Sequence, residues 1–346
     1  MMSPSDRKKR ILAAVIESYV LTAEPVGSKT LADKAGLGVS SATIRNEMSE
    51  LEGLGWLMQP HTSSGRVPSP LGYRAYVNEL MVRHRLSEAE KEQAHLLSRA
   101  HVTELARLLS EAGRIVSDLT GYPSITVTPK MNVGNLLKID LITIDADRIV
   151  LVLVTSAGIV KHRLMYTEQP VPYYILSKLE GVIDERLKGM PISEMSLSQL
   201  AQFEERLGSY RPLLAPIIRS LREMLDELWA REVIVAGESR LLTLPEYQNT
   251  DKAMELLSLL HDRDRILKVL SPDSGHPEVR LTIGGEHPYH ELKESTMITG
   301  SYKLAGKPVG VISVLGPIRM NYGRVLSQFE YFLSELNSVL GRMFNE

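Results

Sequence analysis

Two groups of β-branched runs, separated by a long helical stretch, constrain the fold of this chain more than any other feature. The first group lies between residues 124 and 167, and the second between 279 and 316. Runs such as IVLVLVTSAG and GVISVLG, bounded by turn signals, are typical of strands. Residues 145–148 and 304–307 indicate hairpin turns, so antiparallel pairing is expected. The sequence therefore predicts an α+β chain whose antiparallel-sheet domain is interrupted by a mostly helical insert.

The first 80 residues show a different pattern, which is typical of a small helical module. Helix, helix, tight turn, helix, strand, loop, strand and helix are expected to follow one another here. In the third of these helices Ile44, Met48 and Leu51 recur at i, i+4 and i+7, so they face inward. This order of elements is that of a winged helix-turn-helix module, which in many proteins binds DNA.

The opposite face of the third helix carries short polar residues and an arginine. At about 100° per residue, that face presents Ala42, Asn46 and Ser49, flanked by Thr43 and Arg45. Arginine matches the major-groove edge of guanine, and asparagine that of adenine. The loop HTSSGRVPS contains a single basic residue, Arg66, suited to phosphates or a minor groove. A solvated helix face, or a winged helix that docks on another protein, would show the same pattern.

The charge of the chain allows nucleic-acid binding only through a local patch. The net charge is −2 over 346 residues. Residues 1–85 contain 11 Lys and Arg against 8 Asp and Glu, a balance of +3 that leaves −5 for the rest. This asymmetry has the sign that a DNA-binding N-terminal module requires.

Several classes of protein are disfavoured by what the sequence lacks. The chain contains no cysteine, which excludes disulfides, thiol chemistry and zinc sites built on cysteine, and fits a reducing cytosol. We expect no signal peptide and no membrane span. The phosphate-binding loop, the dinucleotide-binding glycine motif and the nucleophile elbow are all missing. We therefore expect a cytoplasmic protein that is not an enzyme and has no cofactor.

One stretch, GGEHPYHE, raises the question of a metal site. Glu286, His287, His290 and Glu291 lie within six residues of one another, and such side chains ligate zinc. Pro288 disfavours the helix that would align them. A turn between a strand and a helix is the better interpretation, and no metal site is expected.

Two long motifs resemble one protein family. Residues 40–80 read SSATIRNEMSELEGLGWLMQPHTSSGRVPSPLGYRAYVNEL, and residues 281–325 include GVISVLGPIRMNY. Both closely resemble the corresponding regions of the heat-inducible transcription repressor family HrcA. Because the order of domains also matches, the resemblance spans nearly the whole chain.

The resemblance implies three domains. It places a winged-helix DNA-binding domain at 1–80, and a connecting helix at 81–120 leads into a domain of GAF-like fold. That domain would occupy 121–188 and 251–346, with a mostly helical dimerisation domain inserted at 189–250. Members of the family act as dimers on an inverted-repeat operator, CIRCE, upstream of chaperone operons. The chaperonin keeps them active until unfolded protein occupies it.

The residues expected to contact DNA follow from the module and the resemblance together. The recognition helix would contribute Ser41, Ala42, Thr43, Arg45, Asn46 and Ser49, and the wing His61, Ser63, Ser64, Gly65 and Arg66. The expected partners are double-stranded DNA, a second copy of the chain and the chaperonin. Two alternatives stay open: a regulator that senses a small molecule through the GAF-like domain, and an enzyme with a regulatory winged helix.

Overall fold

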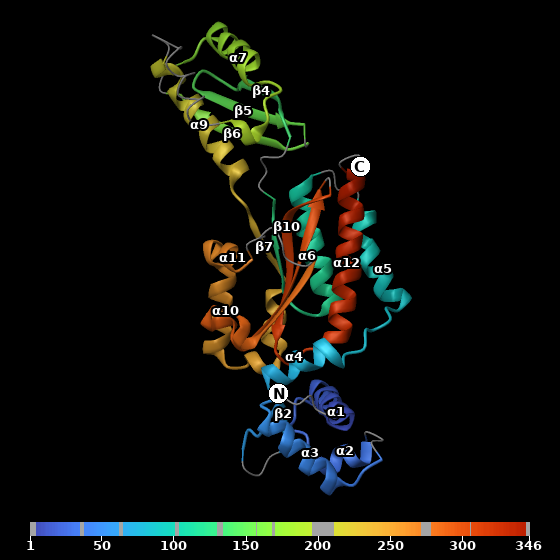
Figure 1. Cartoon of the computed structure of the whole chain (residues 1–346). Helices are drawn as coiled ribbons and strands as arrows, with labels where there is room; N and C mark the ends of the chain where they lie inside the picture. The colour runs from blue at the N-terminus through green and yellow to red at the C-terminus, as the bar shows by residue number, and fades with distance from the viewer. Residues whose placement is uncertain are drawn as a thin grey trace. The chain divides into compact units, whose positions relative to one another are not determined.

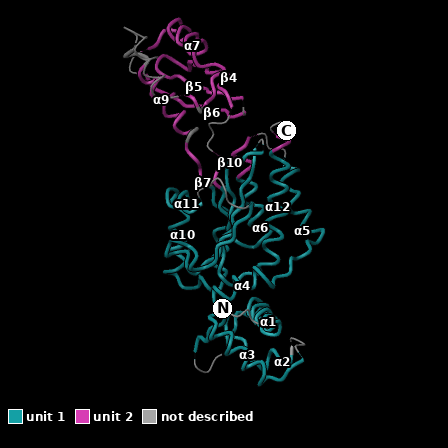
Figure 2. The backbone as a smooth tube through the Cα atoms, in the orientation of Figure 1, with its two compact units in different colours: residues 1–100, 110–126, 233–340 teal, residues 101–109, 127–232, 341–346 magenta. Residues whose placement is uncertain are grey.

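The computed structural model has a mixed helix and sheet architecture with antiparallel sheets, which confirms the predicted α+β class. It describes residues 5–34, 38–61, 65–100, 104–129, 134–156, 158–167, 170–195, 211–270, 278–304 and 306–343. The chain forms two compact units (Figure 2). Unit 1 comprises Met1–Ala100, Ser110–Thr126 and Val233–Leu340; unit 2 comprises His101–Leu109, Val127–Glu232 and Gly341–Glu346.

Unit 1 begins with a helical segment, residues 5–80, which we call the N-terminal module. Its elements are α1 (Asp6–Thr22), α2 (Ser28–Lys34), α3 (Ser41–Gly53), β1 (Leu57–Met58), β2 (Val67–Pro68) and α4 (Pro70–Glu79). The two short strands pair antiparallel. Serines cap α1, α3 and α4, each accepting a hydrogen bond from a backbone N–H in the first turn. Apolar side chains from these elements share one core: Ile11, Leu12, Val15, Ile16, Leu31, Ile44, Leu51, Leu57 and Tyr73.

The rest of unit 1 is built on a five-stranded sheet and is called the sheet domain below. The strands are β3 (Ser124–Val127), β7 (Val233–Ala236), β8 (Val279–Ile283), β9 (Ser295–Leu304) and β10 (Lys307–Pro317), in the order β7-β3-β10-β9-β8. Leu304 pairs with Lys307, which confirms the hairpin predicted at 304–307. Figure 1 shows α5, α6 and α12 on one side of this sheet, and α10 and α11 on the other.

These helices have the following bounds: α5 Glu88–Arg99, α6 Leu105–Thr120, α10 Thr250–His261, α11 Arg263–Val269 and α12 Tyr322–Met343. Short 3-10 turns lie at η3 Glu238–Thr243, η4 Pro245–Tyr247, η5 Gly284–Glu286 and η6 His290–Leu292. On α12, Phe329 and Phe332 are fully buried. A Cβ at Gly300 of β9 would lie 2.8 Å from the Phe329 ring. The absence of a side chain there lets the helix pack close to the sheet.

Unit 2 has its own antiparallel sheet of three strands. They are β4 (Leu136–Thr143), β5 (Arg148–Thr155) and β6 (Val160–Tyr166), in the order β4-β5-β6. The predicted turn at 145–148 joins β4 to β5, and Arg148 pairs there with Asp145. Its helices are α7 (Tyr173–Leu187) and α9 (Arg211–Trp229), with a 3-10 turn η1 (Ile192–Glu194). On β5, Ile149, Leu151 and Leu153 are buried on one face.

The predicted grouping of the strands was wrong. The runs between 124 and 167 were expected to belong to one antiparallel-sheet domain together with those between 279 and 316. Only β3 does so, whereas β4, β5 and β6 pair with one another. These three strands are joined by short connections, so they find antiparallel partners locally. The segment between β3 and β7 is therefore a unit with its own sheet, and not a mostly helical insert confined to 189–250.

The predicted connecting helix at 81–120 was also too simple. The capping box at Ser87 and Glu90 is present and starts α5. That helix ends at Arg99, because the next residue, Ala100, adopts an extended ψ of 90°. A second helix, α6, begins at Leu105.

Candidate nucleic-acid interface

Helix α3 presents the polar face that its periodicity predicts. Ser40 caps the helix by accepting a hydrogen bond from the Thr43 N–H at 3.2 Å, and its hydroxyl is 2.9 Å from the Thr43 hydroxyl. Ile44, Met48 and Leu51 are buried, which fixes the rotation of the helix on the module. The face turned away from this core is exposed at Ser41, Ala42, Arg45, Asn46 and Ser49, and half-buried at Thr43.

Ion pairs with α1 hold α3 in this orientation. Glu47, on the inward side of α3, is only 6% exposed. It accepts a hydrogen bond from Nε of Arg7 at 2.7 Å. Lys8 pairs with Glu50 at 2.6 Å, also on α3. The basic run at the start of the chain is thus partly neutralised within the module. The positive character of the exposed face of α3 therefore depends mainly on α3 itself.

Arg45 is available for a ligand. It lies on the exposed face of α3. Over the described part of the chain, its guanidinium has neither an ion pair nor a hydrogen bond. Since an unpaired guanidinium presents five donors in a planar fork, this side chain can meet the edge of a base without first breaking an internal contact.

Arg66 is placed differently from Arg45. Its Nε donates a hydrogen bond to Oε2 of Glu52, near the end of α3, at 2.9 Å. Its backbone pairs in both directions with Val26, N to O at 2.9 Å and O to N at 2.8 Å. A Cβ at the neighbouring Gly65 would lie 2.4 Å from the Val26 carbonyl oxygen, so this close approach requires glycine. Arg66 therefore joins the hairpin to α3 and to the segment before α2.

The remaining predicted loop residues are only partly described. His61 is exposed, after the end of β1. Ser63 and Ser64 lie outside the described residues. For all the predicted residues, contact with DNA stays a prediction.

The four side chains of the GGEHPYHE stretch turn to different partners. Glu286 binds Arg74 of α4, and Glu291 pairs with Arg265. His290 lies 3.7 Å from Glu255, whereas His287 is 5% exposed. Burial lowers the pKa of His287, only partly offset by a backbone hydrogen bond at Thr282 and by Glu286. The stretch forms the turns η5 and η6, which join β8 to β9, whereas the sequence predicted a turn between a strand and a helix.

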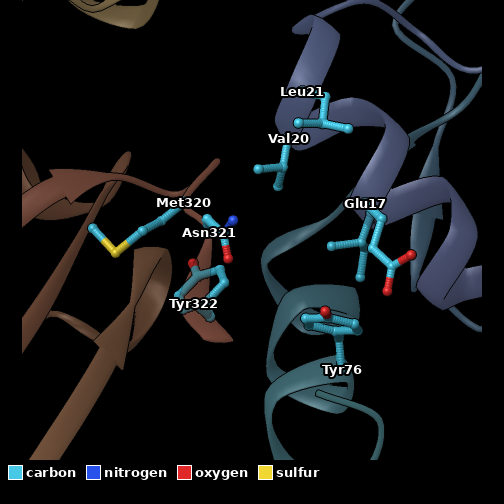
Figure 3. Close-up of a pocket in the computed structure, with 8 residues that line it drawn as sticks. Glu17, Val20, Leu21, Tyr76, Met320, Asn321 and Tyr322 are labelled. Carbon is cyan, nitrogen blue, oxygen red and sulfur yellow. The ribbon is translucent and has the colours of Figure 1, made fainter. Parts of the chain in front are cut away.

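A cavity of about 250 Å³ lies in unit 1 beside the N-terminal module. Figure 3 shows side chains of α1 and α4 on one side of it, and the segment that leads into α12 on the other. The lining is mostly apolar, with one carboxylate and one amide: Ile16, Glu17, Val20, Leu21, Tyr76, Met320, Asn321 and Tyr322.

None of the helices in the described ranges is long and apolar enough to span a membrane.

Sequence reasoning missed the arginines that join the module to the sheet domain. Arg74 of α4 reaches Glu286, and Arg319 reaches the carbonyl of Val20 in α1. Both residues lie inside the two long motifs quoted above, but no periodicity distinguishes them. Their partners are 212 and 299 residues away in the sequence.

Known proteins resemble this chain along nearly its full length. The model of the family "HrcA protein C terminal domain" matches residues 106–326. A heat-inducible transcription repressor HrcA of Acetivibrio thermocellus is 33% identical over 342 residues, 99% of this chain and 97% of that protein. The protein of the same name from Clostridium tetani is 36% identical over 343 residues, 98% of this chain and 97% of that protein.

A solved structure shows the same fold. It is described as the crystal structure of a hypothetical protein at 2.2 Å resolution, and it aligns with a TM-score of 0.70. The alignment covers 99% of this chain and all of that one at 22% identity.

Proposed function

The chain belongs to the HrcA family of heat-inducible transcription repressors, and on that premise we propose that it is a dimeric repressor that binds an inverted-repeat operator through its N-terminal module. The family consists of transcription repressors and not of enzymes, which agrees with the expectation from the sequence. In this proposal the N-terminal module is the winged helix, and the sheet domain is the GAF-like domain. The segment Val127–Glu232 of unit 2 takes the place of the predicted insert at 189–250.

The observation that carries the proposal is the exposed polar face of α3. Arg45, Asn46 and Ser49 lie on one surface, and the guanidinium of Arg45 is unengaged among the described residues. A recognition helix reads bases with such side chains in the major groove. We assign Arg45 and Asn46 to base edges, and Ser41, Thr43 and the loop of residues 61–66 to the sugar-phosphate backbone or the minor groove.

Titration of an inverted-repeat operator tests this assignment. Arg45→Ala should weaken operator binding by about 1–3 kcal/mol and relax sequence preference, because one base-reading side chain is lost. The thermal midpoint should stay unchanged, since the side chain is exposed. The matched control is Arg107→Ala, which removes an exposed arginine of α6, outside the module. If Arg45→Ala and Arg107→Ala bind the operator equally well, α3 is not the recognition helix.

Exposed apolar side chains on one face of the unit 2 sheet support the dimer. Val150 of β5 stands opposite Ile142 of β4 and Leu164 of β6, so these side chains share one face of the sheet. Ile142 is 53% and Leu164 45% exposed. The buried face, by contrast, carries Leu151, opposite Arg163, which pairs with Glu223 and Glu227 of α9. The same face also carries Asp140 and His162, both opposite Val152. A sheet face that exposes apolar side chains beside a few polar ones is suited to pairing with a second copy.

Family membership supports two further parts of the proposal. The operator is the CIRCE inverted repeat upstream of chaperone operons, and the chaperonin keeps the repressor active. Acting on chromosomal operators, the protein would work in the cytoplasm. Operator titrations with purified chaperonin measure the fraction of active repressor. That fraction should rise with chaperonin and fall when an unfolded protein competes for it; a fraction unaffected by either addition contradicts this regulation.

The cavity beside the module favours one second candidate, a regulator that senses a small molecule. Its apolar lining and single carboxylate, Glu17, suit an amphipathic cation. A thermal-shift screen separates the two functions. A saturable stabiliser whose effect disappears in Glu17→Gln would favour the sensor.

A further inference from the structure

Arg319 joins the N-terminal module to the sheet domain. Its side chain is only 15% exposed. Nη1 donates a hydrogen bond to the backbone carbonyl of Val20 at 2.8 Å, while Nε and Nη2 bind the carboxylate of Glu246. Val20 lies in the last turn of α1, where most carbonyl oxygens have no backbone N–H partner within the helix. The arginine therefore satisfies the end of α1 and ties it to η4 of the sheet domain.

Arg74 forms a second tie from α4. Its Nε donates to Oε1 of Glu286 at 2.7 Å, and Nη2 binds both Oε2 of Glu286 and the Leu281 carbonyl, the latter at 2.8 Å. Glu286 in turn accepts the Ile283 N–H at 2.8 Å. The planar guanidinium is thus held by a carboxylate and a carbonyl that belong to the end of β8 and its following turn.

Close packing accompanies these two ties. The rings of Tyr73 of α4 and Tyr322 of α12 lie 5.5 Å apart, and both side chains are 1% exposed. A Cβ at Gly284 would lie 3.3 Å from Pro70 at the start of α4. The module is therefore seated on the sheet domain by apolar contact as well as by hydrogen bonds. All these residues belong to unit 1.

The seated module keeps its recognition face open. Arg45 and Asn46 are exposed while Arg74 and Arg319 are engaged, so the contact does not block DNA. The segment 81–87 between α4 and α5 contains no helix, although Arg83 in it binds Glu330 of α12 and the His84 N–H binds the Gly323 carbonyl. Without the hydrogen bonds of Arg74 and Arg319, the module would be held by these contacts and the apolar packing alone, so it could turn more freely. In a dimer, the direction of each recognition helix sets the distance between the half-sites that it can reach.

We propose that Arg74 and Arg319 are positioning residues that lock the DNA-binding module on the sheet domain and thereby select the spacing of the operator half-sites. The inference rests on the proposed function, because it assigns a role to the contact in DNA recognition. Binding two half-sites at once gains more affinity when the geometry is fixed in advance, because less conformational freedom is lost on binding. Loss of the hydrogen bonds of Arg74 and Arg319 should therefore reduce the preference for one spacer length over another. The affinity for a single half-site should change little.

The first measurement tests, in the absence of DNA, whether the two arginines hold the module in place on the sheet domain. Because the chain contains no cysteine, Leu54→Cys in the module and Leu242→Cys in the sheet domain provide two specific sites, 41% and 57% exposed. Spin labels on this pair, diluted with unlabelled subunits, report the distance within one chain. A narrow distribution is expected for the parent and a broad one for Arg74→Met/Arg319→Met. The matched control, Arg265→Met, loses a pair with Glu291 inside the sheet domain and should stay narrow.

The second measurement follows spacing. The same variants are titrated with inverted repeats of varied spacer length and with a single half-site. At the best spacing the double variant should bind about 10-fold more weakly. Its preference over a spacer changed by roughly 5 bp, half a turn, should shrink to about threefold or less. Binding to one half-site should change less than about twofold.

These measurements test the positioning role of the two arginines separately from the proposed DNA-binding function. A narrow distance distribution in the double variant, or an unchanged spacer preference, overturns the positioning role. If the double variant loses as much affinity for the single half-site as for the inverted repeat, the arginines only maintain the structure of the module and do not select the spacing. If the double variant melts early, Glu246→Gln is measured instead, since it weakens one tie and keeps the side-chain shape. Failure of the parent to bind any inverted repeat would refute the proposed function, while the distance measurement still decides the lock.

Discussion

Two arginines of the N-terminal module show how differently one residue type can be used. Arg45 presents its guanidinium to solvent on α3, whereas the guanidinium of Arg66 donates a hydrogen bond to Glu52. In sequence both are single basic residues among small polar ones. The structure separates them because hydrogen-bond partners, which depend on the hairpin register, are invisible to local pattern.

Arg66→Ala and Glu52→Gln together test whether Arg66 meets phosphate. Arg66→Ala should weaken operator and unrelated DNA alike and reduce the slope of log affinity against log salt by about 1. Glu52→Gln should leave that slope unchanged, because the cation remains. Stability should fall by no more than about 1 kcal/mol, since the pair is partly exposed. If Arg66→Ala keeps the parent's salt slope, the residue positions the hairpin and does not contact the backbone of DNA.

Glu90, in the first turn of α5, has a carboxylate that accepts several hydrogen bonds. It accepts hydrogen bonds from Ser87, His84, Arg324 of α12 and Gln328 of α12. Burial alone would raise its pKa, but the hydrogen bonds, first those from Ser87, outweigh burial and lower the pKa to about 2. The charged form is therefore favoured in the folded chain and links α5 to α12.

This lowered pKa predicts a loss of stability in acid. A depressed folded-state pKa gives stability that is present above the ordinary value of 4.5 and lost as the pH falls towards 2. The difference corresponds to about 3 kcal/mol at most. Glu90→Gln should therefore be less stable than the parent at pH 7, and the gap should close between pH 5 and 2. Urea unfolding across this range measures it, with Glu92→Gln, an exposed neighbour, as control; a gap independent of pH would contradict the assigned pKa.

Among the elements, those with strong local signals were predictable. The i, i+4, i+7 spacing of Ile44, Met48 and Leu51 predicted the buried face of α3, and it is buried. The hairpins at 145–148 and 304–307 carried turn residues and are present. Because the exposed face follows from the buried one, the placement of Arg45 and Asn46 was also predictable.

Strand partners and helix breaks were less accessible from the sequence. A β-branched run predicts a strand, but its partner depends on chain connectivity and on which face becomes buried. β3 and β4 are separated by only a few residues yet join different sheets. The break after Arg99 lacks Gly and Pro, the residues that usually end a helix. For the same reason the ties at Arg74 and Arg319, which require long-range contacts, were missed.

In the proposed dimer, the exposed apolar side chains of the unit 2 sheet predict where the two copies meet. Leu164→Glu places a charge among exposed apolar side chains on β6. It should convert the dimer to a monomer, because burying an unpaired carboxylate in an interface is costly. Light scattering after gel filtration measures the mass. Met254→Glu, on the exposed side of α10, is the control and should remain dimeric; a dimeric Leu164→Glu would move the interface elsewhere.

At the scale of the whole molecule, unit 2 is inserted at a point where the sheet domain is already closed. Thr128 donates its N–H to the Glu232 carbonyl at 2.9 Å, and its hydroxyl accepts the Glu232 N–H at 2.8 Å. The chain thus leaves β3 and returns to β7 at neighbouring positions. A two-residue hairpin loop such as Asn-Gly can bridge such a pair of strand ends, so residues 129–231 are removable in principle without opening the sheet.

Replacing residues 129–231 with Asn-Gly should therefore yield a folded monomer that still recognises DNA. Unit 1 keeps its own core, including Phe329, Phe332 and the module, so its melting should stay cooperative. Binding to one half-site should change less than about twofold, whereas the gain from a second half-site, about 100-fold or more, should vanish. Gel filtration with light scattering and titration of both DNAs measure these outcomes. If the shortened chain still dimerises, unit 2 does not form the dimer interface. If it folds as a monomer but does not bind a single half-site, DNA recognition requires more than the N-terminal module. That result would contradict the assignment of α3 as sufficient for recognition.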